Sequence, residues 1–162
     1  MDYDVIIIGG GPAGLSAGLY SARALKKTLI IEQAAVGGQI MDTSEVQNLP
    51  GSVEDTSSFA IASRMEAQVR EFGATIVMEE VVDVDLSGEW KLVRTTGNEY
   101  RARAIIIATG SHPRKLGAPG EESFVGRGVG YCATCDGAFY TGLPVYVIGG
   151  GDSAFDEGLF LS

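Results

Sequence analysis

The N-terminal segment contains the feature that most restricts the fold, a glycine-rich turn between two apolar runs. Residues 5–8 are a β-branched run without alternation, which is typical of a strand buried on both faces of a parallel sheet. A Gly-x-Gly-x-x-Gly turn follows directly, and residues 15–24 then have the small and apolar composition of a buried helix. A second apolar run, residues 28–31, ends at Glu32. Strand, turn, helix and strand in this order predict a βαβ unit and therefore an α/β fold.

Each glycine of this turn has a separate role in binding a dinucleotide. Gly9 permits the tight turn, Gly11 lets the backbone approach a pyrophosphate, and Gly14 lets the helix pack close to the strand. The N-terminus of the helix faces the phosphates, and Glu32 can accept a hydrogen bond from a ribose hydroxyl. The glycine motif alone is weak evidence and could be a turn without a ligand. Combined with the βαβ unit and the acidic residue, it predicts a dinucleotide site.

The following segments extend this α/β pattern. The loops at 37–39 and 48–51 are candidate ligand-side loops, although ordinary turn chemistry would also explain Gln39 and Asn48. A helix is expected over 57–72, with a serine cap and a core methionine, Met65. The remaining expected elements are a strand at 74–78, an antiparallel three-stranded β-meander formed by 81–86, 90–94 and 99–102, and a further buried strand at 105–108.

A second nucleotide motif begins near the end of the chain. The Gly- and Pro-rich segment 116–122 is the best candidate boundary, so the predicted domains are residues 1–115 and 116–162. Residues 144–148 predict a new buried strand, followed by Gly149-x-Gly151-x-x-Ala154 and an apolar helix to Ser162. No return strand follows, so we expect the start of a second Rossmann-like domain and a chain that is part of a longer protein.

Between the two glycine motifs lie the only two cysteines, Cys132 and Cys135, spaced Cys-x-x-Cys and followed by Asp136. A redox-capable pair between two nucleotide sites indicates a path for electrons. A structural zinc site would need four ligands, and the chain adds only one histidine, His112, far away in sequence. A pair of inert buried thiols is the other alternative.

Charge and hydropathy exclude several classes of partner. The net charge of −9 disfavours nucleic acid, since phosphate binding needs clustered basic residues. The longest apolar run, 104–108, is far too short to span a membrane, and the N-terminus lacks a basic signal region. A cytoplasmic protein is expected, and there a close cysteine pair is more often catalytic or metal-binding than structural.

With these motifs in view, the sequence resembles the N-terminal half of the bacterial- or archaeal-type, low-molecular-weight thioredoxin reductases. These are FAD-dependent pyridine nucleotide-disulfide oxidoreductases. The resemblance runs from Val5 to Ser162. It rests on the first glycine motif, on the Gly-Gly-Gln loop at 37–39, on the Ala-Thr-Gly strand end at 108–110, and above all on the Cys-Ala-Thr-Cys-Asp segment ahead of the second glycine motif.

The resemblance implies a Rossmann-like FAD-binding domain with a β-meander, followed by the start of a domain that binds NADPH. The implied FAD-binding residues are Gly9, Gly11, Pro12, Ala13, Gly14, Glu32, Gln33, Gly37, Gly38, Gln39, Asn48, Val81 (by its backbone), Ala108, Thr109 and Gly110. The implied NADPH-binding residues are Gly149, Gly151, Asp152, Ser153 and Ala154.

The resemblance also implies a reaction in which NADPH reduces FAD, FAD reduces a Cys132–Cys135 disulfide, and the dithiol reduces thioredoxin. Positions i and i+3 lie on one face of a helical turn, which suits such a bond. Cys135 is expected nearer the flavin, with Cys132 as its partner. Asp136 would act as acid and base, which requires a pKa raised by burial; a helix-capping carboxylate is the alternative. A homodimer is implied as well.

Other functions remain compatible with these residues. A related flavoprotein could draw electrons from NADH or ferredoxin, or could serve a peroxiredoxin instead of thioredoxin. A non-catalytic FAD-binding fragment belongs to a different class, and it would bind flavin without turning over a disulfide.

Overall fold

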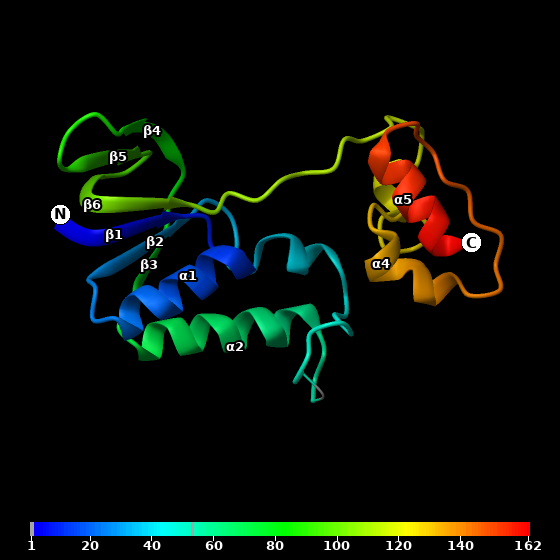
Figure 1. Ribbon diagram of the computed structural model, residues 1–162, viewed down its shortest axis with the longest axis horizontal. Helices are drawn as coiled ribbons and strands as arrows, with labels where there is room; N and C mark the ends of the chain where they lie inside the picture. The colour runs from blue at the N-terminus through cyan, green and yellow to red at the C-terminus, as the bar shows by residue number, and fades with distance from the viewer. Residues whose placement is uncertain (1, 53) are drawn as a thin grey trace. The chain divides into compact units, whose positions relative to one another are not determined.

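The structure is a computed structural model, and it describes residues 2–52 and 54–162. It consists of two compact units (Figure 1). The N-terminal unit ends at Ser111, and the C-terminal unit spans His112–Ser162. The units therefore divide a few residues before the boundary expected between residues 115 and 116.

The N-terminal unit contains a six-stranded sheet in the order β3-β2-β1-β6-β5-β4. Strand β1 pairs in parallel with β2 and β6, and β2 pairs in parallel with β3. Strand β5 pairs in antiparallel fashion with β4 and with β6. The strands are β1 (Asp2–Ile8), β2 (Thr28–Glu32), β3 (Thr75–Met78), β4 (Val81–Asp85), β5 (Lys91–Thr95) and β6 (Glu99–Ile107). The mixed sheet confirms the predicted α/β class and the meander.

Two helices, α1 (Pro12–Arg23) and α2 (Ser58–Glu71), lie side by side along one face of this sheet (Figure 1). The Ser57 hydroxyl accepts the Ala60 amide at 3.3 Å, so the expected serine cap is confirmed. Met65 packs against the apolar cluster between helices and sheet, as predicted for a core methionine. That cluster is formed by Ile7, Leu15, Ala22, Ile30, Val69, Ala74 and Ile76.

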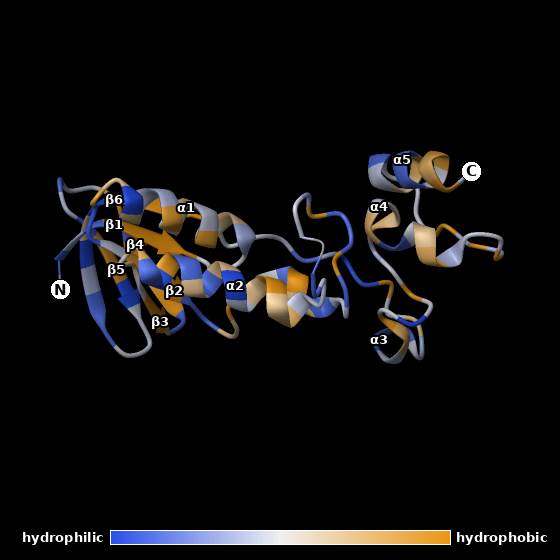
Figure 2. Cartoon of the chain, turned by 90° about the horizontal axis from the view of Figure 1, so that it is seen from below, coloured by the Kyte–Doolittle hydropathy of each residue, from blue (hydrophilic) through white to orange (hydrophobic). Residues whose placement is uncertain are grey.

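The meander packs over the opposite face of strands β1 and β2. Val93 of β5 is completely buried against Ile6 and Ile8 of β1. Tyr100 of β6 meets Tyr3 of β1 edge-on, with ring centroids 6.2 Å apart. Strand β1 is therefore covered on both faces, as its unbroken apolar run predicted. The apolar inner parts of the strands are orange beneath the helices in Figure 2.

Strand β6 corrects the prediction of two separate segments at 99–102 and 105–108. It is one continuous strand that pairs with β5 along Glu99–Ala102 and with β1 from Arg101 to Ile107. Successive backbone groups of a strand point to opposite edges, so one strand can end the meander and extend the parallel sheet. The expected burial of its final residues is wrong: Ile106 is 36% and Ile107 67% exposed, because α1 and α2 pack mainly over β1 and β2.

The C-terminal unit is built from short helices. These are α3 (Glu121–Phe124), α4 (Ala133–Asp136), the 3₁₀ turn η2 (Gly137–Tyr140) and α5 (Asp152–Leu161); a further 3₁₀ turn, η1 (Gly38–Asp42), belongs to the N-terminal unit. α4 packs against α5 and continues into η2. No helix within 2–52 and 54–162 has the length and apolar character needed to cross a membrane.

The buried strand predicted at 144–148 is wrong. These residues form no strand, and Val145, Tyr146 and Ile148 are 45%, 87% and 70% exposed. A strand needs a hydrogen-bonded neighbour, and the C-terminal unit, all of whose residues are described, contains no strand to pair with. The helix predicted after the second glycine motif is present as α5.

Glu79 connects β3 to the meander through hydrogen bonds to three side chains. Its carboxylate accepts the Thr95 hydroxyl, the Asn98 amide at 2.7 Å and the Tyr100 hydroxyl at 3.0 Å. The Thr95 bond is the main reason that the pKa of Glu79 is lowered. Burial, followed by the bond to Glu79, raises the pKa of Tyr100 to about 12. An ionised Glu79 thus stabilises the turn between β5 and β6.

Replacing Glu79 with glutamine is expected to lower the free energy of unfolding by about 1 kcal/mol at neutral pH, a value reduced for solvent screening. Because the folded-state pKa is depressed, the stabilisation is present above the ordinary glutamate pKa of about 4.3 and disappears as the pH falls through the lower folded value. Urea unfolding across this range measures the difference. The exposed neighbour variant Glu80→Gln serves as the control. The prediction would be contradicted if the free energies of unfolding of the parent and of Glu79→Gln differed as much in acid as at neutral pH.

Candidate functional site

The glycine turn after β1 leaves no space for side chains at two positions. A Cβ at Gly9, where φ is 109°, would lie 2.2 Å from the Ala108 carbonyl oxygen. A Cβ at Gly14 would lie 1.9 Å from the Gly9 carbonyl oxygen. The turn therefore packs α1 directly onto β1, and β1 onto the end of β6. The fold therefore brings together Gly9, Gly14 and Ala108, three of the residues that the resemblance assigns to FAD binding.

The N-terminus of α1 offers backbone donors at this turn. Gly11 is the N-cap residue and Pro12 occupies the first helical position. The first hydrogen bond of the helix joins the Leu15 amide to the Gly11 carbonyl at 2.9 Å, so the amides of Ala13 and Gly14 precede it. A Cβ at Gly11 would meet only Gly38 Cα at 3.8 Å and Gly37 O at 3.9 Å. The backbone at Gly11 is therefore open to an anionic group.

Glu32, at the end of β2, is buried beside the turn. One carboxylate oxygen accepts the Gly10 amide at 2.6 Å, and the other accepts the Ala34 amide at 2.9 Å. The sequence predicted a ribose contact and missed the bond to Gly10. Each carboxylate oxygen has a second lone pair, so Glu32 can still accept a hydroxyl proton.

The Gly-Gly-Gln loop lies against the same turn. The Gly37 amide donates to the Gly10 carbonyl at 2.9 Å. The Gln39 side-chain amide donates to the Ser111 carbonyl, which follows the Ala-Thr-Gly end of β6. The loop at 37–39, the first glycine turn and the end of β6 thus form one region of the N-terminal unit.

Several other residues predicted to bind FAD also belong to the N-terminal unit, but in the described part of the chain no hydrogen bond or close backbone approach links them to one another. Gln33, Asn48, Thr109 and Gly110 are exposed loop residues. The side chain of Val81 packs on the core, and its backbone lies at the start of β4. A contact to adenine from Val81 would therefore come from the backbone, as the resemblance implied.

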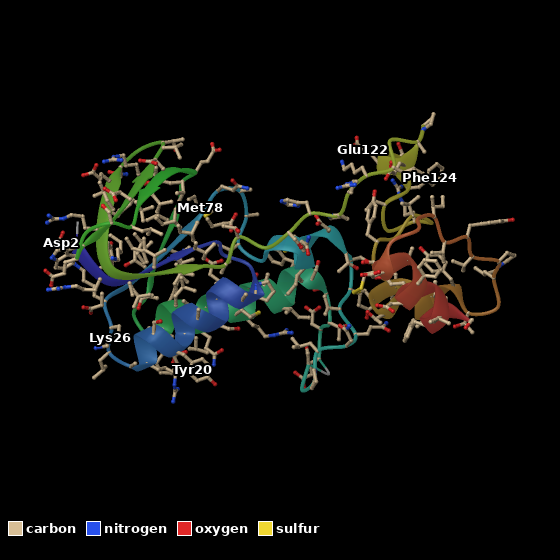
Figure 3. The ribbon with its side chains drawn as sticks, turned by 45° about the horizontal axis from the view of Figure 1, so that its top comes forward. Asp2, Tyr20, Lys26, Met78, Glu122 and Phe124 are labelled. Atoms are coloured by element: carbon tan, nitrogen blue, oxygen red, sulfur yellow. A yellow bond between two sulfur atoms is a disulfide. The ribbon has the colours of Figure 1, made fainter. Side chains whose placement is uncertain are left out.

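In the C-terminal unit, Cys132 and Cys135 are joined by a disulfide, with their Cα atoms 5.2 Å apart (yellow bond in Figure 3). Cys132 is the N-cap residue of α4, and its carbonyl accepts the Cys135 and Asp136 amides at 3.2 and 3.1 Å. The bond therefore closes a single helical turn. Cys135 is exposed and Cys132 is half-buried.

Asp136 directly follows this turn and packs against Gly130, where a Cβ would lie 2.9 Å from its carboxylate. Burial raises the pKa of Asp136, and the negative charge of Glu157 raises this pKa further. An acid and base at this position was expected to need a pKa raised by burial, and the direction of the Asp136 shift agrees with that expectation. Glu157 of α5 also accepts the Ala133 amide at 2.5 Å.

Two acidic residues of this unit were missed by sequence reasoning. Glu157 was taken only as part of an apolar helix, and Glu121 only as part of a linker. The Glu121 carboxylate accepts the Leu116 amide at 2.8 Å, the Gly117 amide at 2.6 Å and the Tyr131 hydroxyl at 2.6 Å. It thereby connects the start of the unit to the residue before Cys132. No sequence signal distinguishes either residue from a solvated surface carboxylate.

The second glycine motif stands at the N-terminus of α5. Gly151 is its N-cap residue, and Asp152, Ser153 and Ala154 form its first turn. Gly149 precedes them, and a Cβ there would lie 3.1 Å from the Ala154 Cβ. The helix half of a nucleotide-binding unit is present, whereas the preceding segment is not paired as a strand.

The family model described as pyridine nucleotide-disulphide oxidoreductase matches residues 3–162. The chain belongs to this family. The family resemblance stated from the sequence is thus confirmed, and both glycine motifs and the disulfide lie within the matched residues.

Individual relatives within the family carry a narrower name. The thioredoxin reductase of Peptoclostridium litorale is 52% identical over 160 residues, covering 99% of this chain and 51% of that protein. A solved thioredoxin reductase from Giardia duodenalis has 36% identity and a TM-score of 0.92, and one from Streptococcus pyogenes has 42% and 0.87. Each match covers 99% of this chain and 52% of the solved chain. The chain therefore spans about half the length of the relatives it matches.

The residues of the first glycine turn fit the dinucleotide cofactor expected in this family. The amides of Ala13 and Gly14 precede the first hydrogen bond of a twelve-residue helix, whose N-terminus attracts anions. The missing side chain at Gly11 leaves the backbone accessible to a pyrophosphate. The buried Glu32 carboxylate lies beside the turn as an acceptor for a ribose hydroxyl.

Proposed function

We propose that this chain supplies the FAD-binding turn and the redox disulfide of a thioredoxin reductase, which passes electrons from NADPH to thioredoxin. The observation that supports this most strongly is the Cys132–Cys135 disulfide on one helical turn, followed by a carboxyl group of raised pKa. A half-buried acid beside a disulfide suits proton-coupled disulfide chemistry.

FAD, when bound, supplies a two-electron carrier between the nicotinamide and the disulfide. The backbone amides of Ala13 and Gly14 would hold its pyrophosphate, and the carboxylate of Glu32 would hold its ribose. The loop at 37–39 and residues 108–110 line the same region. Gly149, Gly151 and the first turn of α5, Asp152 to Ala154, bind the phosphates of NADPH through backbone donors.

Reduction of the disulfide takes two electrons and two protons and produces two thiols. Asp136, whose pKa is raised by burial, is placed to donate one proton as the sulfur–sulfur bond breaks, with Cys135 on the flavin side, and solvent supplies the second proton. The Cys132 thiolate then attacks the thioredoxin disulfide and forms a mixed disulfide, and one thioredoxin sulfur leaves as a thiolate that takes up a proton. The Cys135 thiolate displaces the second thioredoxin sulfur, which restores Cys132–Cys135 and releases reduced thioredoxin.

The setting of the reaction is part of the same proposal. Relatives named thioredoxin reductase support thioredoxin as the protein substrate. We place the reaction in the cytoplasm, where thiols are kept reduced, and in a homodimer.

The test loads the chain with FAD, removes free flavin by gel filtration and mixes it with NADPH, NADH or reduced ferredoxin in a stopped-flow instrument. Loss of flavin absorbance with NADPH, two new thiols per chain, and reduction of added thioredoxin are the expected results. Flavin reduction by NADH or ferredoxin alone would replace NADPH with that donor. Bound flavin without thiol formation under any donor would overturn the proposal in favour of a non-catalytic FAD-binding protein.

A further inference from the structure

We infer that Glu157 is a positioning residue that keeps the Cys132–Cys135 pair strongly reducing. Its carboxylate accepts a hydrogen bond from the Ala133 amide, the first amide of the helical turn that contains the disulfide, here called the redox turn. This inference rests on the proposed redox function of the disulfide. It concerns a contact between α5 and α4 that joins residues 24 positions apart in the sequence.

The geometry places a negative charge at the start of the redox turn. The Ala133 amide immediately follows Cys132, and it donates to the Glu157 carboxylate at 2.5 Å. Ala133 is buried, and Glu157 is half-buried where α5 packs on α4. In a turn that stabilises a thiolate, such an amide and a nearby cation would lower the thiol pKa. Here the amide is already bonded to an anion.

The charged side chains in the sequence segment that contains the turn have one sign. From Gly128 to Ser162 the sequence contains no lysine, arginine or histidine. The titratable groups on the elements packed against α4 are Tyr140 of η2 and Asp152, Asp156 and Glu157 of α5, and α4 itself carries Asp136. Among these, Glu157 is the group whose charge raises the pKa of Asp136, after burial. No cation of this segment offsets it.

A thiolate that forms beside Glu157 is therefore destabilised. Reduction of the disulfide adds two electrons and up to two protons, and near or above the ordinary cysteine pKa of about 8.5 part of the product is thiolate. When the reduced form is less stable, the reduction potential is lower and the pair is a stronger reductant. Thioredoxin itself has a potential of about −270 mV, so a donor to it must be at least comparably reducing. Glu157 thus supplies a property that the proposed reaction needs.

The experiment equilibrates the full chain with dithiothreitol buffers of graded ratio and measures the disulfide fraction by alkylation and mass spectrometry. Glu157→Gln retains an oxygen that can accept the Ala133 amide but removes the charge. In buffers whose pH lies above the ordinary cysteine pKa of about 8.5, we expect the equilibrium to shift by up to about tenfold toward the reduced form, which corresponds to about 30 mV less reducing. The pH midpoint of thiol alkylation should fall in the same variant.

Two further variants separate charge from structure. Asp156→Asn removes one charge from the exposed neighbouring position of α5, and we expect its potential to match the parent. Glu157→Ala removes both charge and hydrogen bond. If only Glu157→Ala changed the potential and the alkylation midpoint, Glu157 would act through structure alone and the inference would be wrong. An equal shift in Asp156→Asn would also overturn it, because long-range charge would then suffice.

The measurement uses neither FAD, NADPH nor thioredoxin. If the proposed function failed, the parent would transfer no electrons from any nicotinamide donor, yet the effect of Glu157 on the dithiol equilibrium would still be observed. A parent that forms no disulfide in these buffers would overturn both proposals. Circular dichroism of each variant confirms that the helices are retained.

Discussion

Replacing Gly14 with alanine is expected to destabilise the N-terminal unit by about 3 kcal/mol and to abolish stable FAD binding. The added Cβ would lie 1.9 Å from the carbonyl oxygen of Gly9 and 2.9 Å from its carbonyl carbon. Both are backbone atoms of a turn held between β1 and β6, so neither can move away cheaply. The clash can be relieved only by lifting α1 from β1, which would also displace the amides proposed to hold the FAD pyrophosphate. Urea unfolding and flavin retention on gel filtration measure the two effects.

Gly11→Ala is the matched control for this prediction. The added Cβ would meet nothing closer than 3.8 Å, and φ at this position is −74°, which any residue adopts. Stability should therefore change by less than about 0.5 kcal/mol. Flavin affinity should still fall by about tenfold or more, because this backbone is where we propose that the pyrophosphate approaches. A Gly14→Ala protein as stable as the parent, or Gly11→Ala with undiminished flavin affinity, would refute this account of the turn.

Replacing Cys135 with serine is expected to reduce thioredoxin turnover by about 10³-fold or more, with flavin retention unchanged. The variant cannot form the Cys132–Cys135 disulfide, which is the acceptor of the flavin electrons in the proposed function. FAD binding should be unaffected, because every residue proposed to hold FAD belongs to the N-terminal unit, whereas Cys135 belongs to the C-terminal unit. NADPH oxidation coupled to thioredoxin reduction, the flavin spectrum and a thiol count provide the three readouts.

Thr134→Ala is the control within the same turn. Thr134 is exposed, and its hydroxyl lies 3.3 Å from the Cys132 sulfur without belonging to the disulfide. We expect turnover to remain within about tenfold of the parent, since one weak hydrogen bond to sulfur is lost. Full thioredoxin turnover by Cys135→Ser would show that the disulfide is not on the electron path.

Several elements could be predicted from the sequence because local chemistry specifies them. The unbroken apolar runs of β1 and β2 indicated strands buried on both faces, and both are covered by helices on one side and the meander on the other. Ser57 marked the start of α2 through its capping hydroxyl. The glycine spacing after β1 indicated where backbones approach one another, and the contacts at Gly9 and Gly14 bear this out.

Other elements could not be predicted because their state depends on partners elsewhere in the fold. Residues 144–148 have the composition of a buried strand but no neighbouring strand to pair with in the C-terminal unit. The separate segments expected before residue 108 form the single strand β6, because both edges of that strand find partners. Its final isoleucines are exposed because the helices cover the adjacent strands instead.

By itself, the sequence determined the βαβ unit, the glycine turn, and a spacing of Cys132 and Cys135 that permits a disulfide. Only the tertiary structure decided how these parts are coupled. The Gly10 amide meets Glu32 across 22 positions, and the Ala133 amide meets Glu157 across 24. Backbone turns and apolar periods are read from neighbouring residues, whereas a buried carboxylate finds its donor only after helices and strands have packed.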